Sequence, residues 1–342
     1  MEHFTLITGG AGFIGSNYAS RCLERGEPIK IFDNLSRPGA QRNLDWLEGI
    51  YGKGSFELIK GDVRDLDAIN RAVIGSEKIL HLAAQVAVTT SVTDPQTDFS
   101  INAQGTFNVL EAARKTGTKP KLIFASTNKV YGGMENVEVI EKATRYDYKD
   151  LPLGADEDQP LDFHSPYGCS KGCGDQYVRD YYRIYGLPTM VLRQSCIYGT
   201  RQFGVEDQGW VAWFIIAAVT GRPITIYGDG KQVRDILFVD DLMDAYDKGF
   251  ERLPELGGQI FNIGGGRQST ISVWQEFQPM LEKLLGRNIA TTQSNWRPGD
   301  QPVFISDIRK AKKLLDWSPK VNVEEGISRL FTWVQDNQSL FK

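Results

Sequence analysis

A tyrosine and a lysine four positions apart, Tyr167 and Lys171, form the pattern that most directly suggests catalysis. On a helix, side chains at this spacing are neighbours on one face. The lysine charge favours the phenolate, so a tyrosine with an ordinary pKa of about 10 can act as a base near neutral pH. The spacing alone is common by chance, and a surface pair on a solvated helix is the structural alternative. Ser126 and Thr127, at the end of an expected strand, and a glycine-rich run upstream strengthen the catalytic interpretation.

The glycine-rich run, TGGAGFIG at residues 8–15, lies between an expected strand and an expected helix. Glycines in such a turn, here Gly9, Gly12 and Gly15, allow a tight bend, close approach of the backbone to a pyrophosphate and close packing of helix on strand. The N-terminus of the helix then offers N–H groups and the positive end of its dipole to phosphates. We therefore expect a nucleotide cofactor and hydride chemistry, with a purely structural turn as the alternative.

Asp33 ends the second expected strand, about 20 residues beyond the glycines, where an acid hydrogen-bonds the adenosine ribose and repels a 2′-phosphate. This position favours NAD over NADP. Arg37 could reach a 2′-phosphate, although a solvated loop charge is its more ordinary role. Asp62, after the third expected strand, is placed to meet the adenine, or equally to cap a helix.

The composition excludes several other classes of protein. A length of 342 residues favours one larger and one smaller domain, and a net charge of −4 argues weakly against nucleic acid or an anionic membrane as the main partner. The longest uncharged apolar run, 211–219, is far shorter than the roughly 18 residues of a membrane span. The N-terminal residues show no signal peptide, and four cysteines and three histidines lack metal-ligand spacing. We expect a cytoplasmic protein that binds no metal.

Short apolar segments alternate with helical stretches over the first 130 residues, which predicts an α/β fold with a Rossmann-type, doubly wound parallel sheet. The expected strands are 4–8, 29–32, 56–60, 78–82, 121–126 and 189–193. The expected helices include 13–25, 99–116, 210–220 and 240–250, the last capped by Asp240. Residues 132–165 read as a long loop. We expect an NAD-binding domain over 1–195, completed by about 233–265, and a smaller mixed α/β carboxy-terminal domain over 196–232 and 266–342.

Nearly the whole chain resembles the extended short-chain dehydrogenase/reductases that modify nucleotide sugars. The segments that carry this resemblance include residues 8–15, 126–132, 167–171, 230–235 and 261–265. Within that family, residues 33–47, 85–91, 161–172 and 201–214 resemble the members that epimerise C2 of CDP-linked sugars, from paratose to tyvelose.

The resemblance implies that NAD stays bound through the cycle and that the smaller domain binds a nucleotide sugar, CDP-linked by the same resemblance. It makes Tyr167 the base, lets Lys171 hold the nicotinamide ribose and tune the tyrosine, and gives Thr127 a hydrogen bond to the reacting hydroxyl. The expected cofactor-binding residues are Gly9, Gly12, Phe13, Ile14, Gly15, Asp33, Asn34, Ser36, Arg37, Asp62, Val63, Leu82, Ala83, Ala84, Gln85, Asn102, Ser126, Tyr167 and Lys171. The expected substrate-binding residues are Thr89, Thr127, Ser195, Arg201, Gln208, Arg234 and Arg297.

Arg234 and Arg297 fall where the family grips the substrate pyrophosphate, and guanidinium forks match phosphate oxygens. Surface salt bridging is the structural alternative for both. Relatives pair through two long helices, here 99–116 and 167–185, so a homodimer or homotetramer is expected.

Two departures from the family pattern bear on the reaction. Dehydrating relatives carry Asp-Glu where this chain has Asn128 and Lys129, and loss of water needs an acid and a base, so a 4,6-dehydratase is disfavoured. Cys196 replaces a substrate-contacting asparagine, which puts the usual 4-epimerase pose in doubt.

A hydroxyl-bearing ring carbon has no acidic hydrogen, so inversion at C2 is expected to pass through a transient 2-keto sugar. The alternatives are a net NAD(P)-dependent nucleotide-sugar oxidoreductase, a C4-epimerase of the same family, and a cofactor-sensing binding protein.

Overall fold

The computed structural model describes residues 3–297 and 299–341, and these residues form two compact units. Of the described residues, the first unit comprises 3–130, 165–193 and 243–261, and the second comprises 131–164, 194–242, 262–297 and 299–341.

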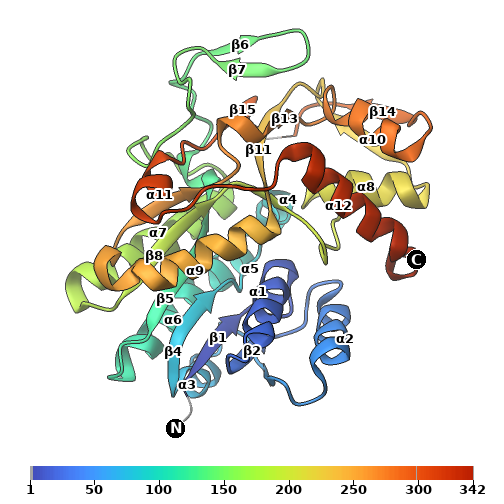
Figure 1. Ribbon diagram of the computed structural model, residues 1–342. Helices are drawn as coiled ribbons and strands as arrows, with labels where there is room; N and C mark the ends of the chain where they lie inside the picture. The colour runs from blue at the N-terminus through green and yellow to red at the C-terminus, as the bar shows by residue number, and fades with distance from the viewer. Residues whose placement is uncertain (1–2, 298, 342) are drawn as a thin grey trace. The chain divides into compact units, whose positions relative to one another are not determined.

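A seven-stranded parallel sheet dominates the first unit, in the order β12-β8-β5-β4-β1-β2-β3 (Figure 1). Its strands are β1 (Phe4–Thr8), β2 (Ile29–Asp33), β3 (Glu57–Lys60), β4 (Ser76–His81), β5 (Lys121–Thr127), β8 (Thr189–Gln194) and β12 (Ile260–Ile263). In the register of the sheet, Thr8 is opposite both Phe32 and His81. The strand order reverses between β1 and β4, and ligands of open α/β sheets bind at the carboxyl ends of strands at such a point. The predicted fold class is confirmed.

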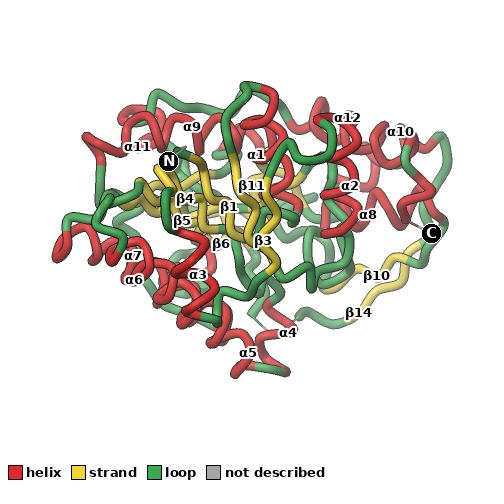
Figure 2. Tube along the Cα trace, turned by 90° about the horizontal axis from the view of Figure 1, so that it is seen from below, coloured by secondary structure: helices red, strands yellow, loops and turns green. Residues whose placement is uncertain are grey.

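Helices cover both faces of this sheet (Figure 2). The helices of the first unit are α1 (Phe13–Glu24), α2 (Ala40–Tyr51), α3 (Leu66–Val73), α4 (Val88–Thr93), α5 (Pro95–Phe99), α6 (Gly105–Lys115), α7 (Ser165–Tyr185) and most of α9 (Val239–Leu256). A π-helical turn, Ser100–Gln104, precedes α6. The helix expected over 99–116 is therefore interrupted in its first part.

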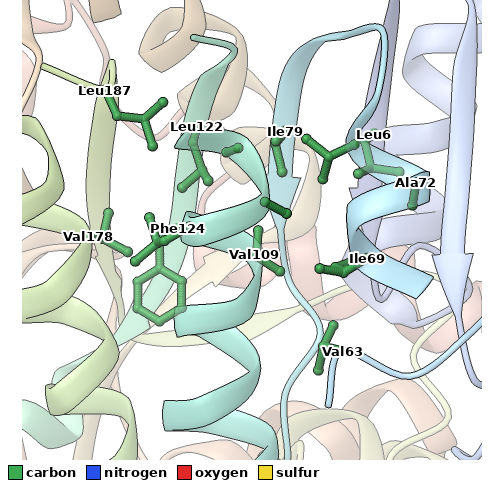
Figure 3. Close-up of a cluster of buried hydrophobic side chains, with 14 of the residues drawn as sticks. Leu6, Val63, Ile69, Ala72, Ile79, Val109, Leu122, Phe124, Val178 and Leu187 are labelled. Carbon is green, nitrogen blue, oxygen red and sulfur yellow. The ribbon is translucent and has the colours of Figure 1, made fainter. Parts of the chain in front are cut away.

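The core of the first unit lies between the sheet and α3, α6 and α7. Figure 3 shows its side chains, with Leu6, Ile79 and Leu122 from the strands and Val109 and Val178 from the helices. These residues are fully buried, and each such aliphatic side chain contributes about 1.5–3 kcal/mol on burial. On the other face, α1 and α9 are joined by ion pairs from Arg21 to Asp244 and Asp247. Helices therefore pack on both faces of the sheet whose carboxyl end carries the candidate site.

The second unit is a smaller mixed α/β structure, as predicted. Its strands are β6 (Val139–Glu141), β7 (Tyr146–Tyr148), β9 (Cys196–Tyr198), β10 (Ile224–Tyr227), β11 (Val233–Phe238), β13 (Thr270–Ser272), β14 (Thr291–Ser294) and β15 (Val303–Phe304). Its helices are α8 (Trp210–Thr220), α10 (Phe277–Leu285), α11 (Arg309–Leu314) and α12 (Val323–Asp336). Short 3-10 turns lie at Asn128–Tyr131, Arg267–Ser269 and Gln338–Phe341.

The grouping of residues differs from the predicted domain boundaries in two places. Residues 131–164, expected in the first domain, contain the β6–β7 hairpin and bond to the second unit through Tyr131 Oη to Asn262 Oδ1 (2.7 Å) and Tyr148 Oη to the Val303 carbonyl (3.0 Å). Strand β11 lies in the stretch 233–265 that was expected to complete the NAD-binding domain, but it pairs with β9, β13 and β15. Within 233–265, only β12 joins the large sheet.

Two expected helix caps are also different in the structure. Helix α9 begins at Val239, so Asp240 lies in its first turn and is not the cap. Helix α3 is capped by Asp65, whose carboxylate accepts from the backbone N–H groups of Asp67 and Ala68, and not by Asp62.

Within the described residues, no helix combines the length and the apolar character needed to cross a bilayer.

Candidate active site

Tyr167 and Lys171 lie one turn apart on α7 with their side chains buried, 9% and 4% exposed. Lys171 Nζ donates to the Ala125 carbonyl at 2.7 Å and lies 4.2 Å from the centre of the Phe124 ring. Thr127 is the last residue of β5, and its side chain is one of the neighbours that lower the pKa of Tyr167. The structure therefore brings together the three residues predicted to be catalytic, from α7 and the carboxyl end of β5.

Burial opposes the charged form of both ionisable groups. It raises the pKa of Tyr167 to about 12, with a further rise from Asp98, although the Thr127 side chain and the Arg37 charge lower it. It lowers the pKa of Lys171 to about 7, against the opposing charges of Asp175 and Asp98. The sequence predicted that Lys171 would bring the pKa of Tyr167 down. Desolvation of the phenolate outweighs the neighbours that lower this pKa, and the tuning role of Lys171 stays a prediction.

A buried ion pair anchors the catalytic helix to the sheet. Asp175, one turn beyond Lys171, accepts from Arg193 Nε at 2.9 Å and Nη2 at 3.0 Å, and from Ser126 Oγ at 2.7 Å. Arg193 belongs to β8 and Ser126 to β5, so one carboxylate joins α7 to two strands. Ser126, predicted as a cofactor contact, thus has a structural partner. Sequence reasoning missed Asp175, although its position four residues after Lys171 on one helix face was a usable signal.

The glycine run forms a close-packed turn at the carboxyl end of β1. Gly9 has a φ of +71°, and a Cβ there would lie 2.8 Å from the Ala83 nitrogen. A Cβ on Gly15 would lie 2.4 Å from the Gly9 carbonyl oxygen. Gly12 precedes the first helical residue, Phe13, and makes no side-chain cap. The first turn of α1, including Phe13 and Ile14, therefore presents backbone N–H groups at a turn that only glycines can form.

Asp33 is buried at the end of β2, and backbone donors hold both its oxygens. Ala11 N donates to Oδ2 at 3.0 Å and Leu35 N to Oδ1 at 2.8 Å. Burial raises the pKa of Asp33, and the backbone hydrogen bonds and the charge of Arg37 oppose the rise. Arg37 is an exposed loop residue, and its charge lowers the pKa of both Asp33 and Tyr167.

A small polar network lies where the adenine of the cofactor is expected. Asn34 Nδ2 donates to Asp62 Oδ2 at 2.9 Å, and Arg64 Nε donates to Asp62 Oδ1 at 2.9 Å, which holds the pKa of Asp62 well below its usual range. Ser36, which is exposed, donates its backbone N–H to Asn34 Oδ1 at 3.0 Å. Val63 is buried, and its Cγ2 would lie 2.6 Å from a Cβ added to Gly105.

Residues 82–85 leave the end of β4 beside the glycine turn. The Leu82 and Ala83 nitrogens donate to Thr8 Oγ1 at 3.2 and 3.3 Å. Ala84 is half-buried in the same segment. Gln85 N donates to Asn102 Oδ1 at 2.9 Å, which fixes two predicted cofactor residues to one another.

Two buried oxygens in this region, Gln85 Oε1 and Thr89 Oγ1, have no hydrogen-bond partner. Buried polar atoms are normally satisfied, so these two are suited to a bound ligand. Together with the glycine turn and the Asp33 carboxylate, they fit a dinucleotide.

The remaining predicted substrate residues lie in the second unit. Arg234 Nη2 pairs with Asp300 Oδ1 at 2.5 Å, and Arg297 Nη2 lies 3.3 Å from Asp207 Oδ1. Both arginines therefore form ion pairs, which is the structural alternative that the sequence left open for them. Asp300 N donates to the Arg297 carbonyl, so both guanidinium groups adjoin one turn. Gln208 lies in the neighbouring loop and bonds to Val205 through the backbone.

Ser195 and Arg201 occupy other parts of the second unit. Ser195 Oγ donates to the Asp235 side chain, next to Arg234. Arg201 is buried with a φ of +68°, and its guanidinium lies 5.8 and 5.6 Å from the ring centres of Phe203 and Trp333. Burial lowers its pKa to about 10. The roles of the expected substrate-binding residues and of the expected cofactor-binding residues stay predictions.

A family model described as GDP-mannose 4,6 dehydratase matches residues 6–330. The chain is 45% identical over 335 residues to the CDP-paratose 2-epimerase of Salmonella typhi, covering 96% of this chain and 98% of that protein.

Two solved structures extend the likeness to three dimensions. The UDP-glucose 4-epimerase of Thermotoga maritima with UDP-glucose has a TM-score of 0.82 at 32% identity, covering 98% of this chain and 99% of that one. The UDP-glucose 4-epimerase of Thermus thermophilus with NAD has a TM-score of 0.79 at 30% identity, covering 97% and 99%.

A Rossmann sheet, a glycine turn at the switch point and a buried tyrosine–lysine pair beside a threonine define a nucleotide-cofactor-dependent enzyme. The chain belongs to the GDP-mannose 4,6-dehydratase-like family of extended short-chain dehydrogenase/reductases. The sequence resemblance to the extended short-chain dehydrogenase/reductases is thereby confirmed, and so is the prediction of NAD as cofactor.

Proposed function

We propose that this protein is an NAD-dependent epimerase that inverts C2 of a CDP-linked hexose, of the CDP-paratose to CDP-tyvelose type, through a transient 2-keto sugar. The observation that carries the proposal is the convergence of Thr127, Tyr167 and Lys171 beside the glycine turn. The relative named CDP-paratose 2-epimerase, matched along almost its whole length, supports the choice of C2 and of CDP.

Each catalytic residue has a distinct task in this proposal. NAD, when bound, would supply the reversible hydride transfer on which this reaction depends. Tyr167 accepts the proton of the reacting hydroxyl and gives it back, while Thr127 orients that hydroxyl. Lys171, when charged, stabilises the phenolate. Glycines 9, 12 and 15 with the first turn of α1 hold the pyrophosphate of the cofactor, and Asp33 holds its adenosine ribose.

The sequence immediately after Thr127 argues against dehydration, although the family model takes its description from a dehydratase. Asn128 is buried, and its side-chain oxygen accepts from Thr127 Oγ1 at 3.3 Å. An amide cannot exchange protons as a carboxylic acid does, so this position lacks the acid that loss of water needs. A permanent keto-deoxy sugar is therefore not the proposed product.

The direct test is to incubate the purified protein with CDP-, UDP- and GDP-linked hexoses and to follow the stereochemistry at C2 by NMR. Inversion at C2 of the CDP sugars without added cofactor is expected. If C2 is inverted by transient oxidation, the hydrogen removed from C2 never meets water, so the epimer formed in D₂O should carry little deuterium there. Stoichiometric deuterium at C2 would exclude this mechanism.

A C4-epimerase is the second candidate, since both solved relatives described above are UDP-glucose 4-epimerases. The same NMR experiment separates the two candidates, because a C4-epimerase would interconvert gluco and galacto configurations of the UDP sugar and leave C2 unchanged. Accumulation of NADH with a released keto sugar would instead identify a net oxidoreductase.

We also propose that the protein pairs with a second copy through α6 and α7. These helices expose Phe107 (41%), Tyr177 (46%) and Tyr182 (40%), and the rings of Phe107 and Tyr177 meet edge to face. Sedimentation of the wild-type protein and of Phe107→Ser tests this, with a shift to monomer expected for the variant.

A further inference from the structure

Asp98 is a buried carboxylate beside the catalytic residues that the sequence-based prediction did not include. It lies on α5, which packs against α7, and its side chain is 0% exposed. A carboxylate in such a place is costly unless it is hydrogen-bonded and faces a cation. Its partners therefore indicate what it does.

The two oxygens of Asp98 hold two different parts of the site. Oδ2 accepts from Ser170 Oγ at 2.5 Å, and Ser170 lies between the predicted base and Lys171 on α7. Oδ1 accepts from Asn102 Nδ2 at 3.0 Å. The same Asn102 amide exchanges hydrogen bonds with the Gln85 backbone, from N to Oδ1 at 2.9 Å and from Nδ2 to the carbonyl at 3.0 Å.

The π-helical turn at Ser100–Gln104 begins two residues after Asp98 and carries Asn102. Such turns are rare and are frequent at functional sites. Asp98 thus connects α7, through Ser170, with the segment after β4, through Asn102.

Two carboxylates, Asp175 and then Asp98, favour the charged form of the buried Lys171. The titratable groups that act electrostatically with Lys171 are Asp98 on α5, Asp175 on α7 and His81 on β4. Asp175 is already neutralised by the double hydrogen bond from Arg193. Burial keeps His81 neutral, since it lowers the pKa of the ring to about 3. Burial raises the pKa of Asp98, and the Ser170 hydrogen bond and the Lys171 ammonium oppose that rise.

We propose that Asp98 is a positioning residue that fixes the Ser170 hydroxyl and the Asn102 amide and keeps the buried Lys171 in its charged form. Without this carboxylate, desolvation shifts Lys171 further toward the neutral amine, which cannot stabilise a phenolate. The kinetic consequence rests on the proposed function, whereas the effect on Lys171 itself does not.

The test is a titration of Lys171 in the whole protein and in Asp98→Asn, which keeps the shape of the side chain and removes its charge. In ¹³C-lysine-labelled protein, the Lys171 Cε signal is assigned by its absence in Lys171→Met. The midpoint, about 7 in the wild type, should fall in Asp98→Asn by about one pH unit.

Asp94→Asn is the matched control. Asp94 caps the same short helix by accepting from Thr97 N at 3.0 Å, and asparagine caps equally well. An equal Lys171 midpoint in Asp98→Asn and Asp94→Asn would overturn the proposal.

Activity and folding provide two further readouts. Where the enzyme turns over a nucleotide sugar, the alkaline limb of kcat against pH should move down by the same shift in Asp98→Asn. If the wild-type protein turns over none of the sugars tested, the proposed function is contradicted. The titration of Lys171 then still tests the role of Asp98. If Asp98→Asn does not fold, the Asp98 carboxyl ¹³C midpoint in Lys171→Met should rise above that of the wild type, and an unchanged midpoint would overturn the proposal.

Discussion

At the level of single residues, burial decides the ionisation of the proposed base and its lysine before any substrate arrives. Tyr167 has a pKa of about 12 and Lys171 of about 7, so at pH 7 Tyr167 is the neutral phenol and Lys171 is about half charged. Thr127 and Arg37 already favour the phenolate. The proposed base is therefore poised by a balance of several neighbours and not by its lysine alone.

Tyr167→Phe removes the proposed base and keeps the ring. Because the ring fills the same space, the variant should fold and keep its NAD content, while kcat should fall by about 10²–10⁴-fold, the range of general acid–base catalysis. Steady-state kinetics with NAD content per chain checks both expectations. A kcat near that of the wild type would show that another group takes the proton.

Asp33→Ala removes the carboxylate that faces the expected ribose position. The preference of the variant for NAD over NADP should be smaller than that of the wild type, because the group that repels a 2′-phosphate is gone. Competitive binding of the two cofactors measures this ratio, and Asp33→Asn serves as the milder variant that removes the charge and keeps an acceptor oxygen for one of the two backbone donors, Ala11 N or Leu35 N. If wild-type protein already co-purifies with NADP, Arg37 and not Asp33 governs the choice.

At the level of elements, the close packing of α1 on the glycine turn is the feature that most constrains the cofactor site. Gly15→Ala would place a Cβ 2.4 Å from the Gly9 carbonyl oxygen, so the backbone must shift. We expect a loss of about 1–3 kcal/mol in the free energy of unfolding and weaker NAD binding.

Gly49→Ala is the control for this change, since Gly49 is also helical and an added Cβ there meets nothing within 4 Å. It should stabilise α2 by about 0.5–1 kcal/mol. Urea unfolding and NAD titration of both variants check the pair. Equal stabilities would show that the turn can relax.

The elements that the sequence predicted well are those whose signals are local. Strands of the parallel sheet are continuous apolar runs, the glycine turn needs particular backbone angles, and the helical period places Tyr167 beside Lys171. Asp98 was missed because its meaning depends on Ser170, 72 positions away. The stretch 233–265 was assigned to the first domain as a whole for the same reason, since an apolar pattern does not identify the partner of β11.

At the level of the whole molecule, a buried histidine links stability to pH. His81 is 1% exposed, Thr8 Oγ1 lies 2.7 Å from its Nδ1, and burial lowers its pKa from 6.5 to about 3. The unfolded chain binds a proton first, so the stability contributed by neutral His81 is present above pH 6.5 and is lost as the pH falls toward 3.

His81→Asn removes this titration. Below pH 6, the free energy of unfolding of the wild type should fall faster than that of the variant by about 1.4 kcal/mol per pH unit. Buried carboxylates with raised pKa values, such as Asp33 and Asp235, act in the opposite direction but are common to both proteins. Urea unfolding at several pH values measures the difference, and parallel curves would contradict the assignment.

The bond between Arg193 and Asp175 has a consequence for how the chain is made. A nascent chain that has emerged only as far as α7 contains Tyr167 and Lys171, but Asp175 still lacks the cation that neutralises it. A buried carboxylate without its partner is costly, so α7 reaches its final place only after β8 has left the ribosome. Strand β12, at the edge of the sheet, is synthesised later still. Chains stalled before residue 193 should therefore carry a protease-sensitive α7, and the catalytic face is among the last parts of the first unit to form.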